Sequence, residues 1–156
     1  MDCPFCDKLA HLEALPQDEL VWCFPRSVAL LGPWQFYQGY CVLVARTHAR
    51  ELSDLGADER RAYLDEMCLL AQGIEASFRP QKLNYELLGN QVPHLHWHLF
   101  PRYTNDTDAR RPVWFALDRA EQDFGLRQKL ETGPQERATT AAALRQSLKG
   151  LGAPRI

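Results

Sequence analysis

The decisive stretch of the chain reads Asn90-Gln91-Val92-Pro93-His94-Leu95-His96-Trp97-His98-Leu99-Phe100-Pro101-Arg102, and it holds three of the five histidines at strictly alternating positions. In a β-strand successive side chains point to opposite faces, so residues two apart lie on the same face about 6.6 Å from one another. The stretch therefore predicts a strand with His94, His96 and His98 on one face. Leu95, Trp97 and Leu99 take the other face, where they can pack on a core while the imidazoles line a cleft.

A row of imidazoles suits three kinds of chemistry: metal ligation, acid-base catalysis, or a nucleophile flanked by phosphate-binding donors. A strand-borne metal centre of the cupin or carbonic anhydrase type needs further ligands, and the cupin pattern expects a nearby carboxylate. Here Pro101, Arg102 and Tyr103 follow the histidines, and the next acidic residue is Asp106 in a polar turn. This basic continuation favours a phosphate substrate over an exposed catalytic metal.

Further strands are predicted on both sides of the histidine strand. Short apolar runs bounded by proline and glycine predict them at Leu20–Phe24, Ser27–Leu31, Tyr40–Ala45 and Leu83–Leu88. The unbroken apolar character of Tyr40–Ala45 is typical of a central strand covered on both faces. The dipeptide Gly89-Asn90 suits a tight connection between Leu83–Leu88 and a strand at Pro93–Phe100.

A long helix is predicted from Ala57 to Phe78, where apolar residues recur at spacings of three and four. Pro80 ends it, because proline disfavours helical geometry in the preceding residue and has no backbone donor. The alanine-rich stretch from Pro134 to Leu148 predicts a terminal helix. Together the elements predict an α+β fold, an antiparallel sheet with a long amphipathic helix packed against it and a C-terminal helical extension.

The composition favours one globular domain. The length of 156 residues, with 46% hydrophobic and 24% charged residues, is that of an average folded domain. We therefore expect a single domain over residues 1–156, with a core at about 3–103 and an extension at about 104–156. The formal net charge of -2 gives no field for binding nucleic acid or an anionic membrane surface.

The sequence also predicts the cellular compartment and the state of the cysteines. The segment Met1–Ala10 has no basic region followed by an apolar one, and no run of 18 apolar residues occurs in the chain. We expect a cytoplasmic protein without a membrane segment. An odd number of cysteines, five, in such a chain indicates reduced thiols, so Cys3 and Cys6 are better metal ligands than disulfide partners.

Three segments together resemble the histidine triad (HIT) superfamily. His94-Leu95-His96-Trp97-His98-Leu99-Phe100 resembles its signature, in which three histidines alternate with apolar residues. Cys3-Pro4-Phe5-Cys6 resembles the amino-terminal Cys-x-x-Cys of zinc-bearing members, and Gly39–His48 is similar to the family segment Gly-His-x-Leu-Val-Ile-Pro-Lys-x-His. The stretch Leu88–His98 resembles the bacterial branch labelled diadenosine tetraphosphate hydrolase. The resemblance covers roughly Cys3 to Tyr103 and implies a HIT-like fold and a homodimer.

The resemblance also implies an activity, a nucleotide hydrolase acting on a phosphoanhydride or phosphoramidate of a purine nucleotide or dinucleoside polyphosphate. His96 matches the middle histidine and would attack the α-phosphorus to form a covalent nucleotidyl-histidine. His98 would donate a hydrogen bond to phosphate or leaving-group oxygens. The residues expected to support substrate binding are Asn84, Asn90 and Gln91.

The resemblance further implies a structural zinc site. Its ligands would be Cys3, Cys6, His48 and His94, which are two thiols and two imidazoles. Four protein ligands close a zinc site, so the metal would pin the amino terminus to the histidine strand without activating water.

The chain departs from the family at one position of the expected nucleotide site. Gly32 stands where the family has an acidic residue that contacts the ribose hydroxyls. This departure keeps a second interpretation open, a nucleotide-binding or scaffolding HIT protein with little turnover. Trp34, Phe36 and Trp114 are either stacking surface for a base or aromatic residues of the core or of a dimer interface. Arg110-Arg111 either reaches substrate phosphates or is solvated surface charge.

Overall fold

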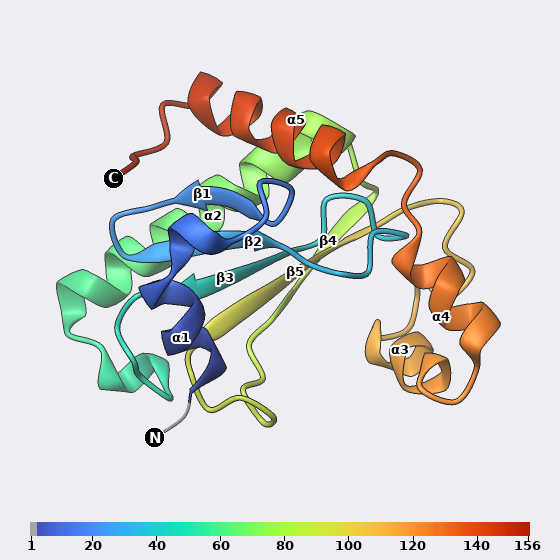
Figure 1. The fold of residues 1–156 in the computed structure, drawn as a ribbon, viewed down its shortest axis with the longest axis horizontal. Coiled ribbons are helices and arrows are strands. Elements are labelled where there is room, and N and C mark those ends of the chain that lie inside the picture. The colour runs from blue at the N-terminus through green and yellow to red at the C-terminus, as the bar shows by residue number, and fades with distance from the viewer. Residues whose placement is uncertain (1–2) are drawn as a thin grey trace.

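A computed structural model describes residues 3–156 of the chain, so Met1 and Asp2 of the segment Met1–Ala10 lie outside the described residues. Its centre is one five-stranded antiparallel sheet in the order β1-β2-β3-β5-β4 (Figure 1). The strands are β1 (Leu20–Cys23), β2 (Ser27–Leu31), β3 (Cys41–Ala45), β4 (Lys82–Glu86) and β5 (His96–Arg102). The expected α+β class with an antiparallel sheet is confirmed.

Strand β3 is the middle strand, as its unbroken apolar run predicted. It pairs with β2 on one side and with β5 on the other, where Val44 lies opposite His96 and Val42 lies opposite His98. Its odd-numbered residues join the larger hydrophobic cluster, whereas Val44 belongs to a smaller cluster on the other face. The sheet therefore has two covered faces, and the histidine side chains of β5 share a face with Val42 and Val44.

Two helices cover one face of the sheet. Helix α2 (Ala57–Phe78) has two acidic residues in its first turn. It is followed by Arg79, which adopts a left-handed conformation before Pro80. Helix α5 (Arg137–Gly150) packs against α2 and β1 (Figure 1). Within residues 3–156, no helix combines the length and the apolar character needed to cross a bilayer.

The remaining helices lie elsewhere around the sheet. Helix α1 (Pro4–Ala10) lies on the face opposite α2, where its apolar residues pack on β2 and β3 (Figure 1). Helices α3 (Trp114–Ala120) and α4 (Phe124–Glu131) form a separate lobe beside the sheet and enclose a second hydrophobic cluster. Two short 3₁₀ turns, η1 (Leu12–Ala14) and η2 (Leu52–Asp54), complete the elements.

The expected tight connection at Gly89-Asn90 is wrong. Strand β4 ends at Glu86 and β5 begins at His96, so residues 87–95 form a long loop between paired strands. Leu95 lies outside the strand because its amide donates to the Ala49 carbonyl, away from the ladder with β4. Gly89 has a φ of 74°, a left-handed conformation that suits glycine. His94 consequently precedes the strand that holds His96 and His98.

Arg102 anchors the chain after β5 to the sheet. Its buried guanidinium forms an ion pair with Asp106, donates to Asn84 Oδ1 at 2.9 Å, and donates to the carbonyls of Asp108 and Arg111. A buried cation needs such a full set of partners. The clamp fixes the turns that lead into α3.

The C-terminal helix α5 is part of the main core, and we expect Leu144→Ala to destabilise the protein by about 2–4 kcal/mol. The Leu144 side chain is fully buried in the cluster between α2, α5 and the sheet, so truncation leaves a cavity. Urea denaturation measures the effect, and Leu151→Ala is the matched control because that leucine is 42% exposed. Equal unfolding free energies for the two variants would show that α5 does not contribute to the stability of the core.

Candidate functional site

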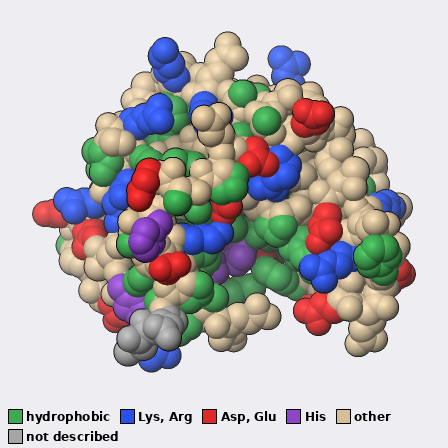
Figure 2. Space-filling view, viewed as in Figure 1, with side chains coloured by type: hydrophobic (Ala, Val, Ile, Leu, Met, Phe, Trp, Pro, Cys, Tyr) green, Lys and Arg blue, Asp and Glu red, His purple; other side chains and the backbone are tan. Residues whose placement is uncertain are grey.

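His96 and His98 lie side by side at a cavity of about 220 Å³. Figure 2 shows a hollow beside the α3 and α4 lobe, with histidine and hydrophobic side chains inside it. The residues lining the cavity are Leu88, Gly89, Asn90, Gln91, Val92, His96, His98 and Trp114. The loop 87–95 thus forms one wall, the histidine strand the floor, and the start of α3 another wall.

The His96 ring is held from two directions. Its Nδ1 lies 2.6 Å from the His94 carbonyl oxygen, which can only accept, so Nδ1 carries the hydrogen. The Phe5 ring of α1 packs against it with centroids 4.7 Å apart. His96 is 6% exposed, and burial lowers its pKa below the ordinary value of 6.5. The imidazole is therefore neutral near pH 7, with its unshared electron pair on Nε2.

The His98 ring is enclosed by aromatic side chains and by His96. Its Nε2 lies 3.1 Å from His96 Nε2, and its Nδ1 lies 2.8 Å from the Tyr40 hydroxyl. The Trp114 ring meets it edge-on at a centroid distance of 5.3 Å. Burial, with a smaller contribution from His96, lowers the pKa of His98 to about 4. Both cavity histidines are thus uncharged over most of the physiological range.

The low pKa of His98 predicts a pH-dependent stability. Between pH 6.5 and about 4 the unfolded chain takes up a proton at residue 98 that the folded protein does not, so stability falls as the pH decreases through that window. We expect His98→Asn to lose less unfolding free energy than wild type between about pH 7 and about pH 4.5. Urea titrations measure the slope, with exposed His11→Asn as control. Equal slopes for His98→Asn and wild type would contradict the prediction.

The structure does not bring all the expected substrate-binding residues together. Asn90 and Gln91 line the cavity, whereas Asn84 lies apart from it in the Arg102 clamp. Trp114 lies at the cavity and its indole nitrogen donates to the Glu86 carboxylate. The neighbouring aromatic residues Trp34 and Phe36 pack against the second hydrophobic cluster.

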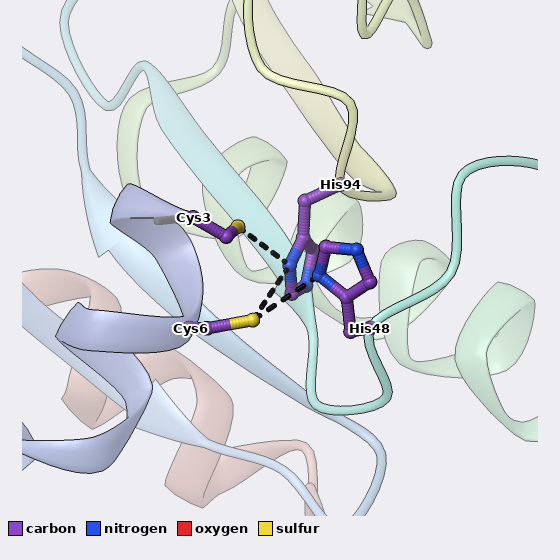
Figure 3. A group of neighbouring side chains, drawn as sticks. All are labelled: Cys3, Cys6, His48 and His94. Atoms are coloured by element: carbon purple, nitrogen blue, oxygen red, sulfur yellow. Dashed lines mark hydrogen bonds between the residues drawn. The ribbon is translucent and has the colours of Figure 1, made fainter. Parts of the chain in front are cut away.

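The metal-ligating side chains expected from the sequence meet at one point (Figure 3). The donor atoms of Cys3, Cys6, His48 and His94 all lie within 4.8 Å of one another. His94 Nδ1 lies 3.3 Å from Cys3 Sγ and 3.5 Å from Cys6 Sγ, and His48 Nδ1 lies 3.2 Å from Cys6 Sγ. Tetrahedral zinc, with bonds of about 2.3 Å to sulfur and about 2.0 Å to nitrogen, separates such donors by about 3.5 Å. The donor set fits zinc, and the expected zinc site is confirmed.

His94 joins the metal site to the cavity. Its Nε2 donates to the Ala45 carbonyl at 2.8 Å, which leaves the Nδ1 electron pair directed at the two cysteines. Its backbone carbonyl accepts from His96 Nδ1. One residue therefore contributes its side chain to the metal site and its main chain to the orientation of His96.

The comparisons with known proteins agree with this geometry. The family model described as HIT domain matches residues 14–105. This chain belongs to the HIT domain family. A histidine triad protein from Bradyrhizobium japonicum is 28% identical with a TM-score of 0.56, and the match covers 71% of this chain and 89% of that one. The comparison with curated proteins finds no match.

Two further solved HIT structures resemble this chain over most of its length. A histidine triad protein from Marinobacter aquaeolei is 26% identical with a TM-score of 0.63, covering 89% of this chain and 95% of its own. A zinc-bound histidine triad family protein from Mycobacterium smegmatis has a TM-score of 0.67 at 18% identity, covering 97% of this chain and 96% of its own. At that identity the likeness shows the HIT fold alone.

Three residues at the HIT site were missed from the sequence. Tyr40 contacts His98, Glu86 accepts from Trp114, and Phe5 packs on His96. The register of β4 against β5 places Glu86 opposite His98, a pairing that became visible only with the loop length known. Phe5 lies in sequence between the expected zinc ligands Cys3 and Cys6. A metal site that holds these two cysteines beside His94 therefore also places Phe5 close to the histidine strand.

Proposed function

We propose that the protein is a nucleotide hydrolase that cleaves a phosphoanhydride or phosphoramidate bond at the α-phosphorus. The observation that carries this proposal is the arrangement of His96. Its Nδ1 hydrogen is held by the His94 carbonyl, and its Nε2 electron pair lies beside the His98 ring at the cavity. A neutral, oriented imidazole is a good nucleophile toward phosphorus.

The proposed reaction has two displacements. His96 Nε2 forms a bond to the α-phosphorus, and the leaving group departs with the electron pair of the broken phosphorus–oxygen or phosphorus–nitrogen bond. His98 donates its Nε2 hydrogen toward the oxygens where negative charge builds. Water then attacks the same phosphorus, and the electron pair of the broken phosphorus–nitrogen bond returns to His96 Nε2. The proton of the attacking water passes to solvent or to the departed leaving group, and the mononucleotide leaves. Asn90 and Gln91 would orient the substrate from the loop wall.

The metal site has a supporting role in this proposal. Cys3, Cys6, His48 and His94 would hold zinc with four protein ligands, which leaves no open position for water. These four ligands would hold α1 and the backbone at residue 94 in place. They would thereby orient Phe5 and His96. The name of the Mycobacterium smegmatis relative, a zinc-bound family member, supports zinc as the ion.

We also propose a substrate class, an assembly state and a cellular location for the protein. The likeness of Leu88–His98 to the diadenosine tetraphosphate hydrolase branch supports a purine dinucleoside polyphosphate as substrate. We further propose one domain over residues 1–156, a homodimer, and a cytoplasmic location. The charge of -2 supports a small-molecule partner over nucleic acid or a membrane.

The test is chromatographic product analysis of the wild-type protein with diadenosine tetraphosphate, an adenosine phosphoramidate and an adenylylated amine. We expect release of a mononucleotide from at least one compound, and the compound with the highest kcat/KM identifies the substrate class. Acid-labile label retained on the protein after rapid quenching would support the nucleotidyl-histidine. Absence of turnover with all three compounds would contradict the proposal.

A specific observation favours the second candidate, a nucleotide-binding HIT protein with little turnover. At Gly32 a Cβ atom would lie 2.1 Å from Cε1 of Tyr40, so a side chain there would collide with the Tyr40 ring as it is placed. The contact that the HIT resemblance implies for an acidic residue there is absent at Gly32. Calorimetric nucleotide binding without product release in the same assays would establish this candidate.

A further inference from the structure

We propose that Tyr40 is a positioning residue, which fixes the hydrogen of His98 on Nε2 through the contact of its hydroxyl with His98 Nδ1. The inference deepens the proposed function and rests on it. Tyr40 stands directly before β3, in the sheet position next to β5, and its hydroxyl lies 2.8 Å from His98 Nδ1. No part of the Tyr40 side chain needs to touch substrate for this role.

The hydrogen positions in the row of side chains follow from one fixed end. The His94 carbonyl only accepts, so neutral His96 carries its hydrogen on Nδ1 and offers an electron pair at Nε2. His98 Nε2 lies 3.1 Å from His96 Nε2, so a hydrogen on His98 Nε2 can be donated to that electron pair. Neutral His98 in this form has its own electron pair on Nδ1, where the Tyr40 hydroxyl lies in position to donate a hydrogen. The contacts of His98 with His96 and with Tyr40 therefore favour the same hydrogen position, Nε2.

The surroundings of Tyr40 hold its hydroxyl in this place. The side chain is 2% exposed, and its ring stacks on Phe100 at a centroid distance of 3.8 Å and an interplanar angle of 8°. Burial raises the pKa of Tyr40 far above its ordinary value, so the phenol keeps its hydrogen. The hydroxyl therefore keeps a hydrogen that it can donate to His98 Nδ1.

The backbone next to Tyr40 is built around the ring. Gly32 leaves the space that the ring occupies, since a Cβ at residue 32 would lie 2.1 Å from Cε1 of Tyr40. The buried Gln35 amide donates to the carbonyls of Gly32 and Tyr40, and its oxygen accepts from the Gly39 amide. The hydrogen bonds of Gln35 thus hold the loop 32–40 in one conformation, and this conformation places the Tyr40 hydroxyl at His98.

The test is Tyr40→Phe, which removes the hydroxyl and keeps the stacked ring. Nitrogen-15 NMR of the imidazoles reports which nitrogen of His98 carries hydrogen, without any need for turnover. We expect the Nε2–H form in wild type and a mixture with the Nδ1–H form in the variant. We also expect kcat to fall about tenfold, the range of one lost hydrogen bond, while KM changes less than about twofold.

Two further variants separate positioning from simple packing. Tyr37→Phe is the matched control, because Tyr37 is also buried and packs on Phe100 at 5.6 Å. It should leave the His98 spectrum and kcat unchanged. Gly32→Ala should displace the Tyr40 ring and reproduce the Tyr40→Phe spectrum. His98 in the Nε2–H form in Tyr40→Phe, or a kcat equal to wild type, would overturn the role. Absence of turnover in wild type would instead remove the proposed function, and the spectra would still decide the hydrogen position.

Discussion

Replacing His96 by alanine is expected to lower kcat below about one per cent of the wild-type value, because the variant lacks the atom that bonds to phosphorus. The fold should persist, since α1, β5 and the metal ligands remain. Single-turnover product analysis with the preferred substrate measures the loss. Trapping after acid and base quenching should also find no nucleotide bound to the variant protein.

The sharper variant is His96→Asn, which separates the nucleophile from its anchor. An asparagine amide can still donate to the His94 carbonyl, the partner of His96 Nδ1, but it has no counterpart to Nε2. We expect the same loss of kcat with unfolding free energy closer to wild type than in His96→Ala. The exposed His11→Ala should be fully active. More than about one per cent activity in His96→Asn would exclude covalent catalysis by this residue.

Periodicity predicted the sheet and the long helix well, because both depend on short-range patterns. The apolar run of Tyr40–Ala45 indicated the central strand, and the spacing across Ala57–Phe78 gave the bounds of α2 as observed. Helix α4 was missed because its residues pack one leucine, Leu130, into the core and show little apolar periodicity. Weak amphipathicity leaves such a helix without a sequence pattern.

The partners of the histidines could not be predicted in the same way. Tyr40 stands directly before β3 and contacts His98 on the neighbouring strand β5. This contact depends on the register of β3 against β5 and on the space left by Gly32. Asn84 was expected at the site as a supporting hydrogen-bond donor. In the structure the Asn84 side-chain oxygen instead accepts a hydrogen bond from Arg102. A buried guanidinium is costly unless its donors have acceptors, and Asn84 supplies one of them.

The second large effect is expected from the double substitution Cys3→Ala and Cys6→Ala. Zinc content should fall from about one equivalent to near zero, and the unfolding free energy should fall by at least about 3 kcal/mol. The physical reason is that α1 is short and contains no buried residue, so its attachment depends on the metal ligands and on a few apolar contacts. Metal analysis and urea denaturation measure both quantities, and Cys68→Ala, at an exposed cysteine of α2, is the control.

The same variant also decides how the metal site influences the cavity. Without the ligands of α1, the His94 side chain loses its two sulfur neighbours, and the Phe5 ring that packs on His96 is released. We therefore expect kcat to fall about tenfold or more, because the nucleophile is less well oriented, with a smaller change in KM. Stoichiometric metal retained by the double variant would instead place the ion on the three triad histidines. In that case the site would be a metalloenzyme centre, and His96 would be a ligand with no electron pair left for phosphorus.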